Sequence, residues 1–260
     1  MIKFSNEEGF IKGKGIYLFD EYKDIKLPRV AIGVFSRYLY QDVIEKFESC
    51  EVGELACANK RTKVYIIKYK DVELTFFMAS VGACRIAADI EDLKVNGVDT
   101  FIIFGNCGVL DKNIPDCSII IPTKGYREEG TSYHYIEDDV LIPMNEKYKD
   151  LFISVLKEKN FKYTEGYTWT TDAPYRETRE KIKYYKENGC VCVEMEGTAI
   201  EAVCRFLNIN YFTFYYAGDN LDGIEWEERS LSGLTNLDVK KEVPYLALEL
   251  AYKIINKEGR

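Results

Sequence analysis

The sequence contains a single histidine, His134, and two tryptophans among its 260 residues. Zinc sites are usually built from clusters of histidine and cysteine, so with one histidine we expect no metal site. No run approaches the roughly 18 apolar residues of a membrane-spanning helix. No block of lysine and arginine indicates a nucleic-acid footprint. We therefore expect neither a membrane nor a nucleic acid as partner.

We expect neither a secretory leader nor a disulfide framework. Its first ten residues, MIKFSNEEGF, contain acids where a signal peptide needs a basic and then an apolar stretch. Its eight cysteines are scattered, and several, including Cys107, Cys192 and Cys204, lie inside apolar runs. This distribution is typical of buried, reduced thiols. We therefore expect a cytoplasmic protein.

Hydrophobic residues make up 47% of the chain, enough for a sizeable core, and the net charge is −8. The length alone allows one large domain or two small ones. Apolar patterns predict buried strands at 29–34, 98–104 and 118–121, and β runs at 63–70, 72–79 and 161–170. Helices are expected at 38–50, 83–96, 143–159 and 239–257. The polar, aromatic segment 124–135 is expected to be a loop.

The stretch Val191–Asp222 carries the strongest functional pattern. It predicts a strand at 190–193, a helix at 197–207 and a second strand at 211–217. Glu194, Met195 and Glu196 fall at the first strand-to-helix junction, and Asp219 follows the second strand. In open α/β sheets, ligands bind at such strand ends. A carboxylate there can accept two sugar hydroxyls, a methionine can lie against the sugar, and an aspartic acid can protonate a leaving group.

The segment VEMEGTAIEAVC resembles the ribose-binding motif of the nucleoside phosphorylase superfamily, which contains purine nucleoside phosphorylase, uridine phosphorylase and methylthioadenosine/S-adenosylhomocysteine nucleosidase. The resemblance extends over about residues 29–234. It implies one domain over 1–260, with a three-layer α/β fold in which helices flank a mixed central β-sheet. It also implies that Glu196 accepts the ribose 2′- and 3′-hydroxyls, with Met195, Glu194 and Val81 beside the sugar.

The same resemblance implies a phosphate site. Gly33 and Arg37 match the spacing of the family's phosphate loop, and Asn106 stands where the family has a serine or threonine. Arg61 is the candidate for a phosphate-binding arginine supplied to a neighbouring subunit; a solvated surface arginine is the alternative. Ile103 stands where phosphorylases have an arginine, so one expected positive charge is absent.

Base recognition is implied for three further positions. Tyr175 belongs to the base-side loop, in which Pro174 replaces the usual phenylalanine. Arg176 or Arg179 of that loop could donate a hydrogen bond to a pyrimidine carbonyl, or these arginines could simply be solvated at the start of a helix. Asp219 matches the residue that protonates N7 of purines, and Arg229 resembles an arginine that assists it.

The resemblance therefore implies a phosphate-dependent cleavage of a purine or uridine nucleoside, giving free base and (deoxy)ribose 1-phosphate. It implies no cofactor besides inorganic phosphate as co-substrate, and a homo-oligomer, either a dimer or a hexamer. Two alternatives stay open. Ile103 favours a nucleosidase that uses water, and the departures from the family pattern also allow a nucleoside-binding protein without turnover.

Overall fold

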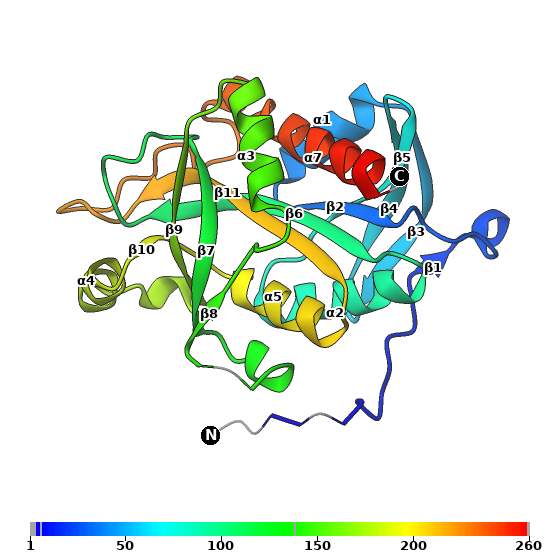
Figure 1. The fold of residues 1–260 in the computed structure, drawn as a ribbon, viewed down its shortest axis with the longest axis horizontal. Coiled ribbons are helices and arrows are strands. Elements are labelled where there is room, and N and C mark those ends of the chain that lie inside the picture. Colours follow the sequence, from blue (N-terminus) through cyan, green and yellow to red (C-terminus); the bar gives the residue numbers. More distant parts are fainter. Residues whose placement is uncertain (1–3, 6, 138, 259–260) are drawn as a thin grey trace.

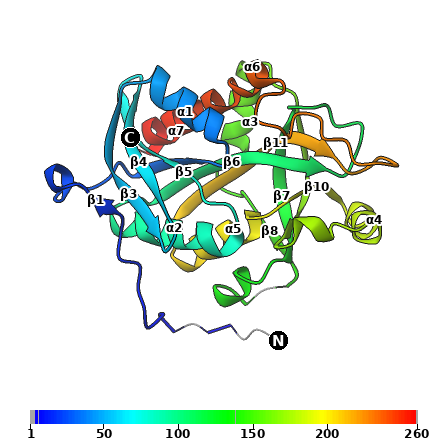
Figure 2. The same ribbon diagram turned by 180° about the vertical axis from the view of Figure 1, so that it is seen from behind.

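The computed structural model describes residues 4–5, 7–137 and 139–258. Its centre is a mixed eleven-stranded sheet with helices on both faces, as Figures 1 and 2 show from opposite sides. The strand order is β1-β3-β4-β5-β2-β6-β10-β9-β7-β11, and β8 pairs with β7. The strands are β1 (Tyr17–Leu18), β2 (Val30–Val34), β3 (Ser49–Cys57), β4 (Lys60–Tyr69), β5 (Val72–Met78), β6 (Thr100–Val109), β7 (Ile119–Glu128), β8 (Leu141–Pro143), β9 (Tyr163–Thr171), β10 (Cys190–Glu194) and β11 (Asn210–Asn220).

The helices form the two outer layers. α1, α3 and α7 cover one face of the sheet, whereas α2 and α5 cover the other (Figure 1). This arrangement confirms the expected three-layer α/β fold. The helices are α1 (Arg37–Lys46), α2 (Ala83–Val95), α3 (Lys149–Glu158), α4 (Arg179–Glu187), α5 (Gly197–Phe206), α6 (Leu237–Lys240) and α7 (Val243–Glu258), with short 3₁₀ turns at Asp20–Tyr22, Ser132–His134 and Pro174–Arg176.

The central strands are apolar on both faces because helices cover both. Every residue of β2 is buried, and β6 is buried except at Asn106. One core lies between the sheet and α1, α3 and α7, and includes stacked rings of Phe104 and Phe214. The other lies between the sheet and α2 and α5. Strands buried on both faces read as continuous hydrophobic runs, which is why the sequence predicts β2 and the first half of β6.

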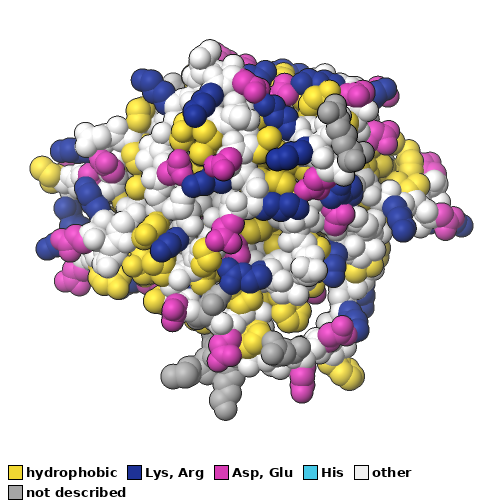
Figure 3. All heavy atoms as spheres, viewed as in Figure 1, with side chains coloured by type: hydrophobic (Ala, Val, Ile, Leu, Met, Phe, Trp, Pro, Cys, Tyr) yellow, Lys and Arg dark blue, Asp and Glu magenta, His cyan; other side chains and the backbone are white. Residues whose placement is uncertain are grey.

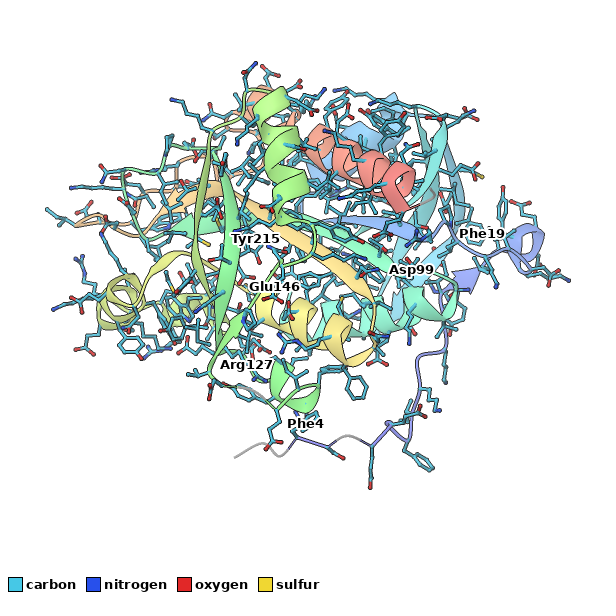
Figure 4. The ribbon with its side chains drawn as sticks, in the orientation of Figure 1. Phe4, Phe19, Asp99, Arg127, Glu146 and Tyr215 are labelled. Atoms are coloured by element: carbon cyan, nitrogen blue, oxygen red, sulfur yellow. The ribbon has the colours of Figure 1, made fainter. Side chains whose placement is uncertain are left out.

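The sheet closes on itself around its second half. β6 pairs with β10 and also with β11, so the strands β6, β10, β9, β7 and β11 form a ring. Inside it lies a small core that includes Cys107, Ile120, Cys192 and Tyr215. Figure 4 labels Tyr215 in the interior of the molecule. The ring places the ends of β6, β10 and β11 close together.

One edge of β6 changes partner along its length, and this creates an opening. β2 pairs with β6 as far as Phe104, and β10 joins the same edge only at Gly108. Among the described residues, 105–107 therefore have no strand partner on that edge. β11 pairs along the whole of the opposite edge. The opening lies beside Asn106, at the ends of several strands, where an α/β sheet offers room for a ligand.

Several predicted boundaries are wrong. The helix expected at 38–50 ends at Lys46, and the chain then forms β3, which the sequence did not predict. The segment 124–135 is not a loop throughout, because β7 continues to Glu128. The helix expected at 143–159 begins only at Lys149, and the closing helix at Val243. The strands β6 and β11 run on through the glycine-containing segments that were expected to end them.

In the described part of the chain, no helix is long and apolar enough to cross a membrane. On the face shown in Figure 3, lysine and arginine side chains are interspersed with aspartate and glutamate, and no large area carries one sign of charge. Charges of both signs close together give a weak net field, unlike the basic face of a nucleic-acid-binding protein.

Candidate active site

A cavity of about 240 Å³ lies at the opening beside β6. Six of the residues singled out from the sequence line it, and they come from four separate parts of the chain. They are Val81, Asn106, Glu194, Met195, Glu196 and Asp219. The structure therefore brings together the predicted sugar-binding residues, one predicted phosphate ligand and the predicted proton donor.

Glu194 is the anchor of the strand-to-helix junction. It ends β10, and its Oε2 accepts hydrogen bonds from the backbone N–H groups of Glu196 at 2.7 Å and Gly197 at 2.5 Å. Its Oε1 accepts from the hydroxyls of Thr168 at 3.0 Å and Thr170 at 2.6 Å, both on the parallel neighbour β9. Burial raises the pKa of Glu194, and these four donors oppose that rise. Glu194 therefore shapes the turn that presents Glu196.

Glu196 is the carboxyl that remains available to a ligand. It caps α5, and its Oε1 accepts a 2.6 Å hydrogen bond from the backbone N–H of Gly82 at the start of α2. Burial, followed by the neighbouring charge of Glu194, raises the pKa of Glu196 to about 8. Gly82 has a φ of +99°, a backbone conformation that favours glycine and turns its N–H toward Glu196. Val81, just before it, is 64% exposed and borders the cavity.

Asp219 lies at the far side of the cavity, on β11. A register shift between Ala217 and Asp219 interrupts the pairing of β11 with β6, and a bulge of this kind re-aims a side chain. Asp219 Oδ2 accepts a 2.8 Å hydrogen bond from the indole N–H of Trp226. Burial raises the pKa of Asp219, while this hydrogen bond lowers it. Trp226 is held over Asp219 because backbone bonds between Asn220 and Glu227 close the loop at 2.9 and 3.1 Å.

A second, wider cavity of about 620 Å³ adjoins the first. The two share Pro174, Glu177, Asp219 and Leu231. The wider cavity lies in the range of small-ligand sites, roughly 300–1,000 Å³. Two predicted base-binding residues line it: Tyr175, whose side chain is 99% exposed, and Arg179. Arg179 already donates a short hydrogen bond to the carbonyl of Ile224, which links α4 to the loop after β11.

Other predicted residues lie outside both cavities. Arg37 is exposed at the first position of α1, and Gly33 is buried within β2, where an added Cβ would lie 2.6 Å from the ring of Phe77. Arg61 lies on β4, pairs with Glu54 at 2.9 Å and covers the ring of Tyr17. A single chain does not bring these three residues into contact with the cavity.

Arg229 lies behind Asp219 rather than in the cavity. Its guanidinium donates to the backbone carbonyls of Ile114 at 3.0 Å and Lys112 at 3.3 Å. Its positive charge also lowers the pKa of Asp219, by less than the hydrogen bond from Trp226 does. Arg229 therefore holds the loop after β11 against the backbone of Lys112 and Ile114. It affects Asp219 only through its charge.

The sequence did not single out several residues that complete the cavity. Phe35, Tyr215 and Leu231 supply apolar lining, and Glu177 adds a further carboxyl. The Phe35 ring packs against Gly105, where an added Cβ would lie 2.8 Å from it. Glu177 could have been noticed as an acid inside the base-side loop. Trp226 carried no local signal, because its role depends on the closure of a loop.

Ile103, in the place of the missing arginine, is fully buried in the core beneath α2 and α5. None of the described residues that line the cavity of about 240 Å³ is lysine or arginine. Among the described residues, no group of three or more His, Cys, Asp or Glu side chains is placed to hold a metal ion. The absence of a metal or organic cofactor stays a prediction.

A carboxyl-lined cavity at the strand ends of an α/β sheet is typical of proteins that bind small molecules. A family model described as the phosphorylase superfamily matches residues 29–254. The chain belongs to that superfamily, whose members include nucleoside phosphorylases and nucleosidases. This confirms the family that the ribose-binding motif indicated.

Individual relatives are distant. Guanosine phosphorylase of Halorubrum lacusprofundi is 27% identical over 158 residues, which make up 60% of this chain and 65% of that protein. The chain thus spans slightly less than two thirds of that relative.

Among solved structures, purine nucleoside phosphorylase of Toxoplasma gondii superposes with a TM-score of 0.76 at 17% identity, covering 96% of this chain and 99% of the other. The methylthioadenosine/S-adenosylhomocysteine nucleosidase of Campylobacter jejuni gives 0.71 at 21% identity, covering 87% and 99%. These two likenesses show the fold.

Proposed function

We propose that this protein cleaves the N-glycosidic bond of a purine nucleoside, with inorganic phosphate as the attacking group. The observation that carries the proposal is the placement of Glu196 and Met195 in the same cavity as Asp219. The first two suit a ribose, and the third suits a base. The guanosine phosphorylase relative supports the choice of a phosphorylase acting on purines.

The sugar end of the cavity works by positioning. Glu196 accepts hydrogen bonds from the 2′- and 3′-hydroxyls, and Met195 packs against the ring. Hydroxyls that donate to Glu196 stabilise its ionised form, so substrate binding lowers the raised pKa of this group. The backbone N–H of Gly82 holds one carboxylate oxygen in place beforehand. A fixed sugar brings its anomeric carbon into line with the attacking group, which is where positioning contributes to rate.

The base end works by proton transfer. As the bond between C1′ and N9 breaks, electrons flow into the purine, and Asp219 donates its proton to N7. A donor needs to be protonated near neutral pH, and burial raises the pKa of Asp219 in that direction. The N–H of Trp226 fixes one carboxyl oxygen and leaves the other to face the base. Phosphate oxygen forms the new bond to C1′, giving ribose 1-phosphate.

Asn106, which lines the cavity, holds the phosphate there. Arg37 lies outside the cavity, two residues after Phe35 of its wall, and its assignment to the phosphate rests on the sequence spacing. Gly33 has no side chain, so β2 can pack close to the ring of Phe77, and this packing sets the position of the turn between β2 and α1. Arg61 lies away from the cavity of its own chain, so its proposed phosphate contact requires a second copy, in a dimer or hexamer. A homo-oligomer with shared sites is therefore part of the proposal.

Hydrolysis by water is the second candidate, and one observation favours it. Among the described residues that line the cavity of about 240 Å³, four carry a carboxyl and none carries a positive charge. This negative charge would repel a phosphate dianion. In that case Arg37 and Arg61 have surface roles only. A nucleosidase with the same sugar and base contacts would release free ribose.

The experiment is base release from guanosine, inosine, adenosine, uridine and methylthioadenosine, with and without phosphate, followed by chromatography of base and sugar. We expect release from purine nucleosides only with phosphate, together with ribose 1-phosphate. Equal release of base without phosphate would show that the reaction is hydrolysis rather than phosphorolysis. Uridine cleaved faster than every purine would overturn the role given to Asp219. Binding of nucleosides without any release would identify a protein that binds but does not turn over.

A further inference from the structure

A buried carboxyl outside the two cavities, that of Glu129, joins the segment 129–136 to helix α5. Glu129 directly follows β7, and only 2% of it is exposed. Its Oε1 accepts a 3.0 Å hydrogen bond from the hydroxyl of Thr198 on α5. Its Oε2 accepts a 2.9 Å hydrogen bond from the backbone N–H of Ser132. The sequence motifs assign no role to Glu129, and the proposed mechanism does not use it.

Thr198 is the point at which α5 meets this carboxyl. It is the second residue of the helix, two positions after Glu196, and it is fully buried. Its backbone N–H donates to the hydroxyl of Thr170 at 3.2 Å, and that hydroxyl donates to Glu194 at 2.6 Å. A chain of hydrogen bonds therefore links Glu129 to Glu194, the carboxyl that shapes the turn of Glu196.

The start of α5 depends on such outside contacts because no side-chain cap closes it. The first N–H groups of a helix have no partner within the helix. Glu196 holds the capping position, but its side chain accepts none of these N–H groups and so stays available to Gly82 and to a ligand. Glu194 and Thr170 accept the N–H groups of the first turn instead. The direction of Glu196 is therefore set by residues outside its own helix.

The segment 129–136 also holds α2, the other helix that begins at the proposed sugar site. The Tyr135 hydroxyl donates to Glu91 of α2 at 2.6 Å, and the Tyr135 ring packs edge-on against a ring of α5 at 5.7 Å. The segment lies beside α5 (Figure 1). Gly82, whose N–H donates to Glu196, precedes the first residue of α2. One segment thus contacts both of the helices whose starts meet at Glu196.

We propose that Glu129 is a positioning residue for the sugar site: through Thr198 it sets the first turn of α5, so that Glu196 meets the ribose hydroxyls. Glu129 lines neither cavity, so it acts through α5 and not on the substrate. This inference rests on the proposed function. A displaced Glu196 loses its contact with the 2′-hydroxyl, whereas a 2′-deoxyribonucleoside has no such contact to lose. Glu129 therefore sustains the preference for ribonucleosides over 2′-deoxyribonucleosides.

The test is the specificity constant kcat/KM for a ribonucleoside and its 2′-deoxy counterpart, with guanosine and 2′-deoxyguanosine as the starting pair. Thr198→Val removes the hydroxyl that donates to Glu129 and keeps the shape of the side chain, whereas Thr198→Ser keeps the hydroxyl. Glu129→Gln leaves one acceptor oxygen for two donors. Glu137→Gln changes an exposed acid just beyond the segment and serves as the matched control.

We expect Thr198→Val to lower kcat/KM about 10-fold for the ribonucleoside and about 3-fold or less for the 2′-deoxyribonucleoside, the range of one hydrogen bond to a charged group. Thr198→Ser should retain the wild-type preference for the ribonucleoside, and Glu129→Gln should fall between Thr198→Val and the wild type. Glu137→Gln should leave both constants unchanged. A purely structural contact would lower both constants alike, so the ratio of the two reports the positioning of Glu196.

An unchanged ratio in Thr198→Val, with or without a loss of activity, would overturn the assignment. If Thr198→Val does not fold, the ratio in Glu129→Gln against that in Glu137→Gln decides in the same way. A second measurement separates this inference from the proposed reaction. If the wild type releases no base, calorimetric binding of guanosine and 2′-deoxyguanosine still tests Glu129. A preference for guanosine that Thr198→Val reduces and Thr198→Ser retains supports the inference, whereas equal affinities in the wild type, an unchanged preference in Thr198→Val, or no binding, overturns it.

Discussion

Replacing Glu196 by glutamine should stabilise the protein at alkaline pH. The folded protein raises the pKa of Glu196 from 4.5 to about 8, mainly through burial. Between these values the folded state binds more protons than the unfolded state, so stability falls as the pH rises through that window. A full rise of this size corresponds to roughly 5 kcal/mol, since each pKa unit is worth about 1.36 kcal/mol.

The expected gain is smaller than this limit because solvent in the cavity screens part of the charge. We expect Glu196→Gln to add about 2 kcal/mol at pH 8.5, or about 4–8 °C in the thermal midpoint of a chain of this size. The amide oxygen of glutamine can still accept the hydrogen bond from Gly82. At pH 5 wild-type Glu196 is itself mostly protonated and neutral, so the two proteins should unfold at nearly the same temperature.

The assay is scanning calorimetry of both proteins at pH 5.0 and pH 8.5, with Glu180→Gln as the exposed control on α4. The informative quantity is the difference in midpoint between variant and wild type at each pH. If the midpoint difference were the same at pH 5.0 and pH 8.5, the reasoning would be refuted, because ionisation of Glu196 would then make no contribution to stability. The variant should lose base release at both pH values.

Two further predictions concern the neighbours of this group. Glu194→Gln should destabilise the fold by about 2–4 kcal/mol in urea unfolding, because the NH₂ group of the amide would face two of the four donors that now surround the carboxylate. A loss below about 0.5 kcal/mol would contradict this anchoring role. Trp226→Phe removes the N–H that lowers the pKa of Asp219, so the alkaline limb of the kcat–pH profile should move to higher pH, and an unmoved limb would argue against Asp219 as the acid.

The proposed sugar-binding residues could be singled out from the sequence because they are adjacent in the chain. Glu194, Met195 and Glu196 occupy one turn between β10 and α5, and a local pattern is enough to find them. Trp226 could not be found in this way. Its position over Asp219 depends on the closure of the loop after β11, and no periodicity in the sequence indicates that closure.

The missed strand β3 has an equally physical cause. A register shift between Glu51 and Gly53 interrupts its pairing with β4. Its buried residues Val52 and Leu55 are therefore three positions apart rather than two. This spacing breaks the alternation that predicts a half-buried strand, so no strand was predicted here. The strand β2, whose pairings with β5 and β6 have no such shift, followed the expected pattern.

The position of β11 has a consequence for synthesis of the chain. β11 lies between β6 and β7 in space, yet it comes about a hundred residues after β6 in sequence. Contacts between such distant segments form slowly, because a long loop must close before they are made. A nascent chain that has not yet emerged beyond residue 220 lacks both this joining strand and Asp219. The ring of strands and the proposed proton donor thus arrive together, late in translation, and until then the edges of β6 and β7 are exposed to aggregation and to chaperones.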